Sequence, residues 1–148
     1  MTSFFDQLIE LEAFGTSRDE KAVAFMLAVN ESYAHHFANC AEYQKFCLRR
    51  GFTKDSVFSS PDELPVMPVQ AFKEYGEFLV SSINGTKKNL LLQSSATSGR
   101  PSSVSIDKAT ARRQVQTMSR SLIHFVGSKR RPFLVFDVDP KVASPGVI

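Results

Sequence analysis

Apolar residues recur with helical spacing over the first fifty residues of the chain. Residues 4–13 place their large apolar side chains on one broad face, which predicts a short amphipathic helix. Ser17 and Glu20 then have the spacing of a capping box, which marks the start of a second helix. This helical pattern extends to Arg50, and a break is expected near Asn39 because Asn favours helix ends.

Short segments follow in the middle of the chain. Three prolines within residues 52–68 predict an irregular connector with tight turns. Residues 69–75 are then expected to form one or two helical turns. Residues 77–81 and 88–93 are strand candidates, and Asn84-Gly85 between them predicts a hairpin turn.

A long helix and a buried strand are predicted toward the C-terminus. Asp107 can cap a helix that runs to Phe125, with Gly127 at its end. Residues 132–138 are apolar on both faces, which is typical of a central strand. The helix carries an apolar stripe formed by Ala111, Val115, Met118, Leu122 and Phe125.

The order of these elements predicts the α/β fold class. N-terminal helices are followed by a hairpin, a polar loop, a crossover helix and a further strand. We expect residues 1–60 to be mainly helical and residues 61–148 to form the α/β part that bears the loop. A strand at this place in an α/β fold normally continues into further helices and strands, so the pattern predicts an incomplete fold.

The polar loop between residues 93 and 102 is the strongest candidate site. Strand-like runs precede and follow it, so its backbone N–H groups can converge on one anion. Its hydroxyl groups can donate to phosphate oxygens, and Arg100 adds a charged planar fork. An ordinary Ser-rich turn is the alternative. The candidate nucleotide ligands are Ser94, Ser95, Thr97, Ser98, Gly99 and Arg100.

This loop resembles a known signature. Residues 94–102 are similar to the phosphate loop of adenylate-forming enzymes, which reads roughly Ser-Ser-Gly-Thr-Thr-Gly, any residue, Pro, Lys. The chain departs from that pattern at Ala96, where the family has Gly, and at Ser102, where it has Lys. Residues 64–73, Leu-Pro-Val-Met-Pro-Val-Gln-Ala-Phe-Lys, resemble the approach to this loop in LuxE-type acyl-protein synthetases.

The resemblance extends over nearly the whole chain in the family's order. It includes Asp107 to Thr110 with Gln114, and then residues 131–137, Arg-Pro-Phe-Leu-Val-Phe-Asp. It covers only the N-terminal part of the family, whose members are more than twice as long. The acyl-carrying cysteine and the catalytic lysine of the family are therefore expected outside this chain.

The resemblance implies an ATP-dependent ligase that also uses Mg²⁺. A fatty acyl carboxylate would be activated as acyl-AMP and passed to a protein cysteine thiol. An acyl-protein reductase would then receive the acyl group, as in a bioluminescence-related fatty-acid reductase system. The alternative is a non-catalytic remnant that binds an anion or a partner protein.

Composition restricts the other function classes. The chain has 148 residues, of which 43% are hydrophobic and 22% charged, values typical of a globular protein. No apolar run reaches the ~20 residues that a membrane span needs, and no signal peptide is visible, so a cytoplasmic location is expected. The net charge of +3, with basic residues in short clusters, disfavours nucleic-acid binding. The apolar 132–138 strand suggests self-association.

Cysteine and histidine give no strong chemical candidate. Cys40 and Cys47 lie seven residues apart on an expected helix, about 10 Å along its axis, which is too far for a disulfide within one helix. They are expected to be reduced core thiols. His36 and Cys40 have a spacing that could ligate a metal, but zinc needs three or four ligands, so no metal site is predicted.

Overall fold

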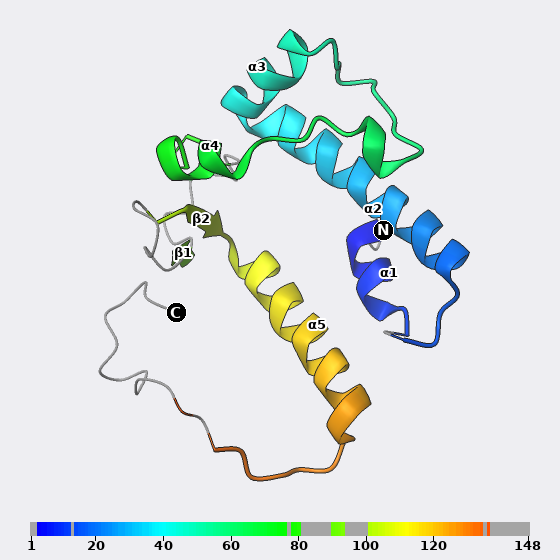
Figure 1. Cartoon of the computed structure of the whole chain (residues 1–148). Coiled ribbons are helices and arrows are strands. Elements are labelled where there is room, and N and C mark those ends of the chain that lie inside the picture. The colour runs from blue at the N-terminus through cyan, green and yellow to red at the C-terminus, as the bar shows by residue number, and fades with distance from the viewer. Residues whose placement is uncertain are drawn as a thin grey trace.

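The computed structural model describes most of the chain. The described residues are 3–12, 14–76, 78–80, 90–93, 101–134 and 136. They contain the helices α1 (Phe4–Glu10), α2 (Arg18–Asn39), α3 (Ala41–Arg49), α4 (Val69–Glu74) and α5 (Lys108–Val126), and the 3-10 turn η1 (Pro61–Glu63). They also contain the strands β1 (Leu90–Gln93) and β2 (Ser103–Ile106). In Figure 1, α1 lies between α2 and α5.

The predicted start of the second helix is confirmed. Ser17 accepts a hydrogen bond from the Glu20 backbone N–H, and the Glu20 carboxylate accepts from the Ser17 N–H, so both halves of the capping box form. The expected break is also present, because Cys40 has extended backbone between α2 and α3. The first helix is shorter than the predicted 4–13 and ends at Glu10, where Leu11 is already extended.

The core lies between α2, α3 and the connector that follows them. Tyr33, Phe37, Cys47 and Phe58 are its buried residues. The rings of Tyr33 and Phe58 meet edge to face with their centroids 4.9 Å apart. The Tyr33 hydroxyl donates to the Thr53 carbonyl at 2.7 Å, so burial leaves it satisfied.

The connector is irregular, as its prolines predict, but it is firmly attached to α2. The Asn30 side chain donates to the Phe58 carbonyl at 2.9 Å and accepts from the Phe58 N–H at 2.8 Å. This two-way contact satisfies both backbone polar groups of Phe58. Gly51, at the end of α3, has a positive φ of 83°, which a glycine adopts at little cost.

The strand pairing differs from the predicted hairpin. β1 matches the end of the predicted 88–93 strand, but its partner is β2, antiparallel, with Leu90 opposite Ile106. Phe78, Leu79 and Val80, within the predicted 77–81 strand, form no strand, and a turn and a bend occupy Phe78 and Leu79. The N–H groups of Phe78 and Leu79 both donate back to the Tyr75 carbonyl, at 2.9 and 3.2 Å, and so are not offered to a neighbouring strand. The Asn84-Gly85 turn lies outside the described residues.

The predicted helix after Asp107 is confirmed. The Asp107 carboxylate accepts from the Thr110 N–H at 2.7 Å and caps α5. At the other end Gly127 has a φ of 76°, a conformation that favours glycine.

The predicted 132–138 strand is wrong for its described residues. Residues 132–134 and 136 form no strand, and Phe133, Leu134 and Phe136 are 61%, 87% and 96% exposed. A strand is stabilised by a neighbour, and neither described strand pairs with this segment. The described residues thus form a mainly helical domain with one small antiparallel sheet, and the further strand of the expected α/β fold is not found among them.

Candidate functional site

A large cleft separates the N-terminal helices from β2 and α5. Its volume is about 1130 Å³, and apolar side chains provide most of its surface. α1 and α2 form one wall, β2 and α5 form the opposite wall, and α4 closes one side. The apolar side chains that line the cleft include Phe5, Met67, Phe72, Val104, Ile106 and Met118.

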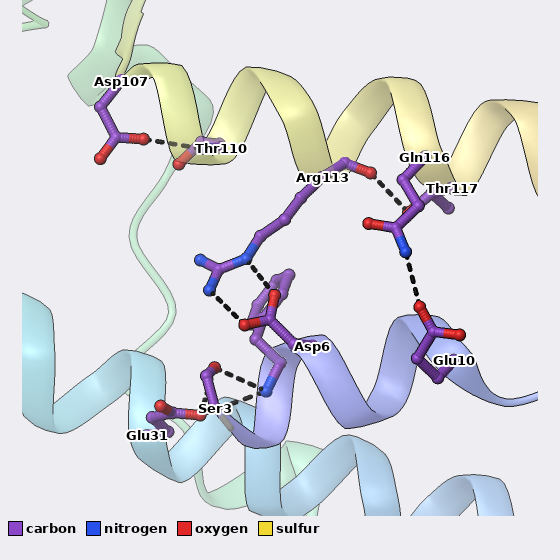
Figure 2. A network of polar contacts seen from close by, with 10 residues as sticks. Ser3, Asp6, Glu10, Glu31, Asp107, Thr110, Arg113, Gln116 and Thr117 are labelled. Carbon is purple, nitrogen blue, oxygen red and sulfur yellow. Dashed lines mark hydrogen bonds and ion pairs between the residues drawn. The ribbon is translucent and has the colours of Figure 1, made fainter. Parts of the chain in front are cut away.

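An ion pair joins the two walls of the cleft. Figure 2 shows the Arg113 guanidinium extending from α5 to Asp6 on α1. Arg113 Nε lies 2.7 Å from Asp6 Oδ1, and its terminal nitrogen lies 3.0 Å from Oδ2, a bidentate geometry. The hydrogen bond from Arg113 holds the pKa of the Asp6 carboxyl below its usual value, and Asp6 in turn raises the pKa of Arg113.

A second group of polar contacts continues along the same two helices. Glu10 accepts from the Gln116 side chain at 2.6 Å and from Arg120 at 2.9 Å. Arg120 also donates to the Glu10 carbonyl at 2.7 Å, at the C-terminal end of α1. Asp6, Glu10, Arg113, Gln116 and Arg120 are called the α1–α5 clasp below. These contacts are polar, so α1 and α5 are held together mainly by charge and hydrogen bonding.

The positive charge of Arg113 is more than compensated by nearby carboxylates. Besides Asp6, the carboxylates of Glu31 and Asp107 also raise the Arg113 pKa. Glu31 accepts from the Ser3 hydroxyl at 3.0 Å and from the Phe5 N–H at 3.1 Å, so it is held in place beside the N-terminus of α1 (Figure 2). This part of the cleft therefore has three carboxylates around one guanidinium, and it disfavours an additional anion.

Beyond Glu31, the α2 wall of the cleft presents His35 and His36. Burial, followed by the neighbouring His35, lowers the pKa of His36 and favours its neutral form. Burial also raises the pKa of the Cys47 thiol behind this wall, and that of the Tyr43 hydroxyl. Both cysteines are buried and unbridged, as expected, although Cys40 lies between α2 and α3 instead of within one helix. Within the described part of the chain no group of three metal-ligating side chains is found.

The predicted phosphate loop lies outside the described residues. This applies to every candidate ligand in it: Ser94, Ser95, Thr97, Ser98, Gly99 and Arg100. The strands on either side are described, and Gln93 lies opposite Ser103 in the β1–β2 register. The two ends of the loop therefore start from one end of this sheet, and β2 continues from there along the cleft wall.

The cleft brings together two segments that carry the family resemblance. Met67 and Phe72 belong to the Pro-rich segment that precedes the loop, and Asp107, Thr110 and Gln114 belong to the segment that follows it. All five line the cleft. The sequence pattern did not predict this convergence, because it depends on α4 packing beside β2.

Sequence reasoning also missed the role of Arg113. In the sequence Arg113 is part of a short basic cluster with Arg112, whereas in the structure it forms the bidentate ion pair with Asp6. The helical spacing of Arg113, Gln116 and Arg120 was the available signal, because it places them on one face of α5.

Comparison with known proteins identifies the family. The family model described as "Acyl-protein synthetase, LuxE" matches residues 1–145. The chain belongs to this family. No curated protein and no solved structure matches this LuxE-family chain. None of its described helices is both long and apolar enough to cross a membrane.

Proposed function

We propose that this chain takes part in the ATP-dependent activation of a fatty acyl carboxylate and its transfer to a protein cysteine. The match of the acyl-protein synthetase family model over residues 1–145 is the observation that carries this proposal. The convergence of two family-like segments on one cleft supports it. Both segments flank the predicted phosphate loop in the sequence.

The proposed reaction has two steps. A carboxylate oxygen of the acyl substrate attacks the α-phosphorus of ATP, the bond to the bridging oxygen breaks, and pyrophosphate leaves. The sulfur of a cysteine thiolate then attacks the acyl carbonyl carbon, and AMP leaves with the electron pair of its bond to that carbon. The resulting thioester would supply an acyl-protein reductase with its substrate.

The loop at residues 94–100 would hold the phosphates that leave. Charge accumulates on pyrophosphate as the bond to the α-phosphorus breaks, and positioned donors stabilise it. The hydroxyls of Ser94, Ser95, Thr97 and Ser98 and the Arg100 guanidinium are suitable donors. Mg²⁺ would neutralise part of the phosphate charge. The pairing of β1 with β2 supports this role, because it brings the two ends of the loop together.

The acceptor thiol is proposed to lie outside residues 1–148. The sequence contains two cysteines, and both are buried, Cys47 completely. Burial also raises the pKa of Cys47, which lowers the fraction of reactive thiolate. We therefore expect neither cysteine of residues 1–148 to accept the acyl group as a thioester.

A second candidate function is a non-catalytic module that binds an anion or a partner protein. The exposed apolar stripe of α5 favours it, since Val115, Met118, Leu122 and Phe125 are all exposed. The two functions differ in what the loop binds. A protein-binding module does not require MgATP at residues 94–100.

Titration with MgATP tests the proposed function directly. We expect the amide resonances of residues 94–100 to shift on addition of millimolar MgATP to the isotope-labelled chain. Arg100→Ala should weaken this binding more than Ser95→Ala, because charged contacts to phosphate are about twice as strong as neutral ones. Arg130→Ala, at an exposed arginine outside the loop, is the matched control. Loop resonances that stay unchanged at millimolar MgATP would refute the phosphate assignment.

A further inference from the structure

We infer that the cleft between α1, α2, α4, β2 and α5 holds the hydrocarbon chain of the acyl substrate. This inference rests on the proposed function and locates its substrate. Small-molecule sites typically have volumes of about 300–1,000 Å³ and are lined mainly by apolar side chains. At about 1130 Å³ the cleft is large enough for a long aliphatic ligand.

The apolar part of the cleft has the side chains that such a ligand prefers. Phe5, Met67, Phe72, Val104 and Met118 approach it from four different elements and one connector. Methionine side chains are flexible and polarizable, so Met67 and Met118 can adapt to an aliphatic ligand that has no fixed shape. Each methylene group removed from water adds to the binding free energy, so an aliphatic chain gains affinity with its length.

Electrostatics sets the orientation of the ligand. Arg113 lies within the stretch of α5 that lines the cleft, and the carboxylates of Asp6, Glu31 and Asp107 lie near it. A carboxylate placed there would meet three negative groups and one guanidinium that is already paired. The acyl carboxylate therefore lies away from this charged group, along β2 toward Ser103, where the strand joins the predicted phosphate loop. In this orientation the acyl carboxylate lies on the side of the predicted phosphate loop, as its attack on the α-phosphorus of ATP requires.

Helix α5 offers a matched pair of positions for a test. Met118 and Val115 belong to the same apolar stripe and are similarly exposed, at 72% and 65%. Met118 lines the cleft, whereas Val115 does not. Because both side chains are exposed, a glutamate at either position should leave the fold intact. Val104, on β2, also lines the cleft and provides a second position, on another element of the same wall.

The experiment measures binding of cis-parinaric acid by its fluorescence and its displacement by myristate. Met118→Glu and Val104→Glu should each weaken binding at least about tenfold, because each puts a carboxylate against hydrocarbon. Val115→Glu should change it by less than about twofold. Met118→Leu, which preserves an apolar surface, should bind like the wild type.

Two results would overturn the inference. If the wild-type chain binds neither fatty acid, the cleft is not an acyl site. If Val115→Glu weakens binding as strongly as Met118→Glu, the exposed stripe of α5 binds the probe instead. In both cases the MgATP titration of the wild type decides the proposed function separately, since the loop at 94–100 and the cleft are perturbed by different ligands.

Discussion

Helices α2 and α5 are of similar length, with 22 and 19 residues, but they are used differently. α2 buries Ala28, Tyr33 and Phe37, whereas α5 has no buried residue among those it contains. Both sequences carry apolar side chains at helical spacing. The comparison shows that such a stripe predicts a helix reliably, but does not say whether another element covers the stripe.

The difference follows from what lies next to each helix. α1, α3 and the connector after α3 all pack against α2, and Phe58 closes its core. α5 meets α1 through the polar α1–α5 clasp, and the large side chains of its apolar stripe stay exposed, although the Phe125 ring contacts Phe14 edge to face at 5.1 Å. Part of that stripe, Met118, borders the cleft.

The largest contrast should appear in stability. Phe58→Ala should lower the free energy of unfolding by about 3–5 kcal/mol, because it leaves a cavity beside Tyr33 and Phe52. Phe125→Ala removes a ring that is 71% exposed and should cost less than about 1 kcal/mol. Urea unfolding followed by circular dichroism measures both. Equal costs would mean that the α5 stripe is covered in solution.

The second-largest effect should be a change in the self-association of the chain. We expect the chain to self-associate through the exposed stripe of α5, because unpartnered apolar faces of this kind promote contact. Leu122→Glu should raise the dissociation constant about tenfold, since it introduces a charge into the contact. Val57→Glu makes the same chemical change at an exposed valine of the connector and is the control. Light scattering of a monomer at all concentrations for the wild type would contradict this expectation.

The α1–α5 clasp should give the smallest effect, and a pH-dependent one. The hydrogen bond from Arg113 lowers the pKa of Asp6, and the hydrogen bonds at the start of α5 lower that of Asp107. A lowered folded-state pKa stabilises the fold above the unfolded pKa near 3.8, and this contribution is lost as the pH falls through the folded-state value. Acidification below about pH 4 should therefore loosen the contact between α1 and α5.

Neutral variants sharpen this test. Asp6→Asn should reduce the loss of stability between about pH 6 and about pH 3, because the group that titrates has been removed. High salt should mimic the effect of the variant, since the pair is partly exposed and screened. Asp55→Asn, at an exposed carboxylate outside the ion pairs of the described residues, is the control. A pH profile unchanged by Asp6→Asn would show that the clasp does not contribute.

The sequence by itself determined the local features of this protein. The capping box at Ser17, the cap at Asp107 and the end of α5 at Gly127 could all be predicted. Each depends on hydrogen bonds or backbone angles within about four residues, so neighbouring side chains fix the outcome. The family resemblance was likewise confirmed by the match over residues 1–145.

Only the tertiary structure decided which elements meet. β1 pairs with β2 and not with residues 78–80, Arg113 binds Asp6 from 107 positions away, and the apolar 132–136 segment is exposed where it is described. The cleft likewise depends on α4 lying beside β2. A hydrophobic or charged pattern indicates which kind of partner a side chain needs, but many distant residues could be that partner. The choice among them depends on packing and chain connectivity over the whole fold, and local sequence carries no record of that choice.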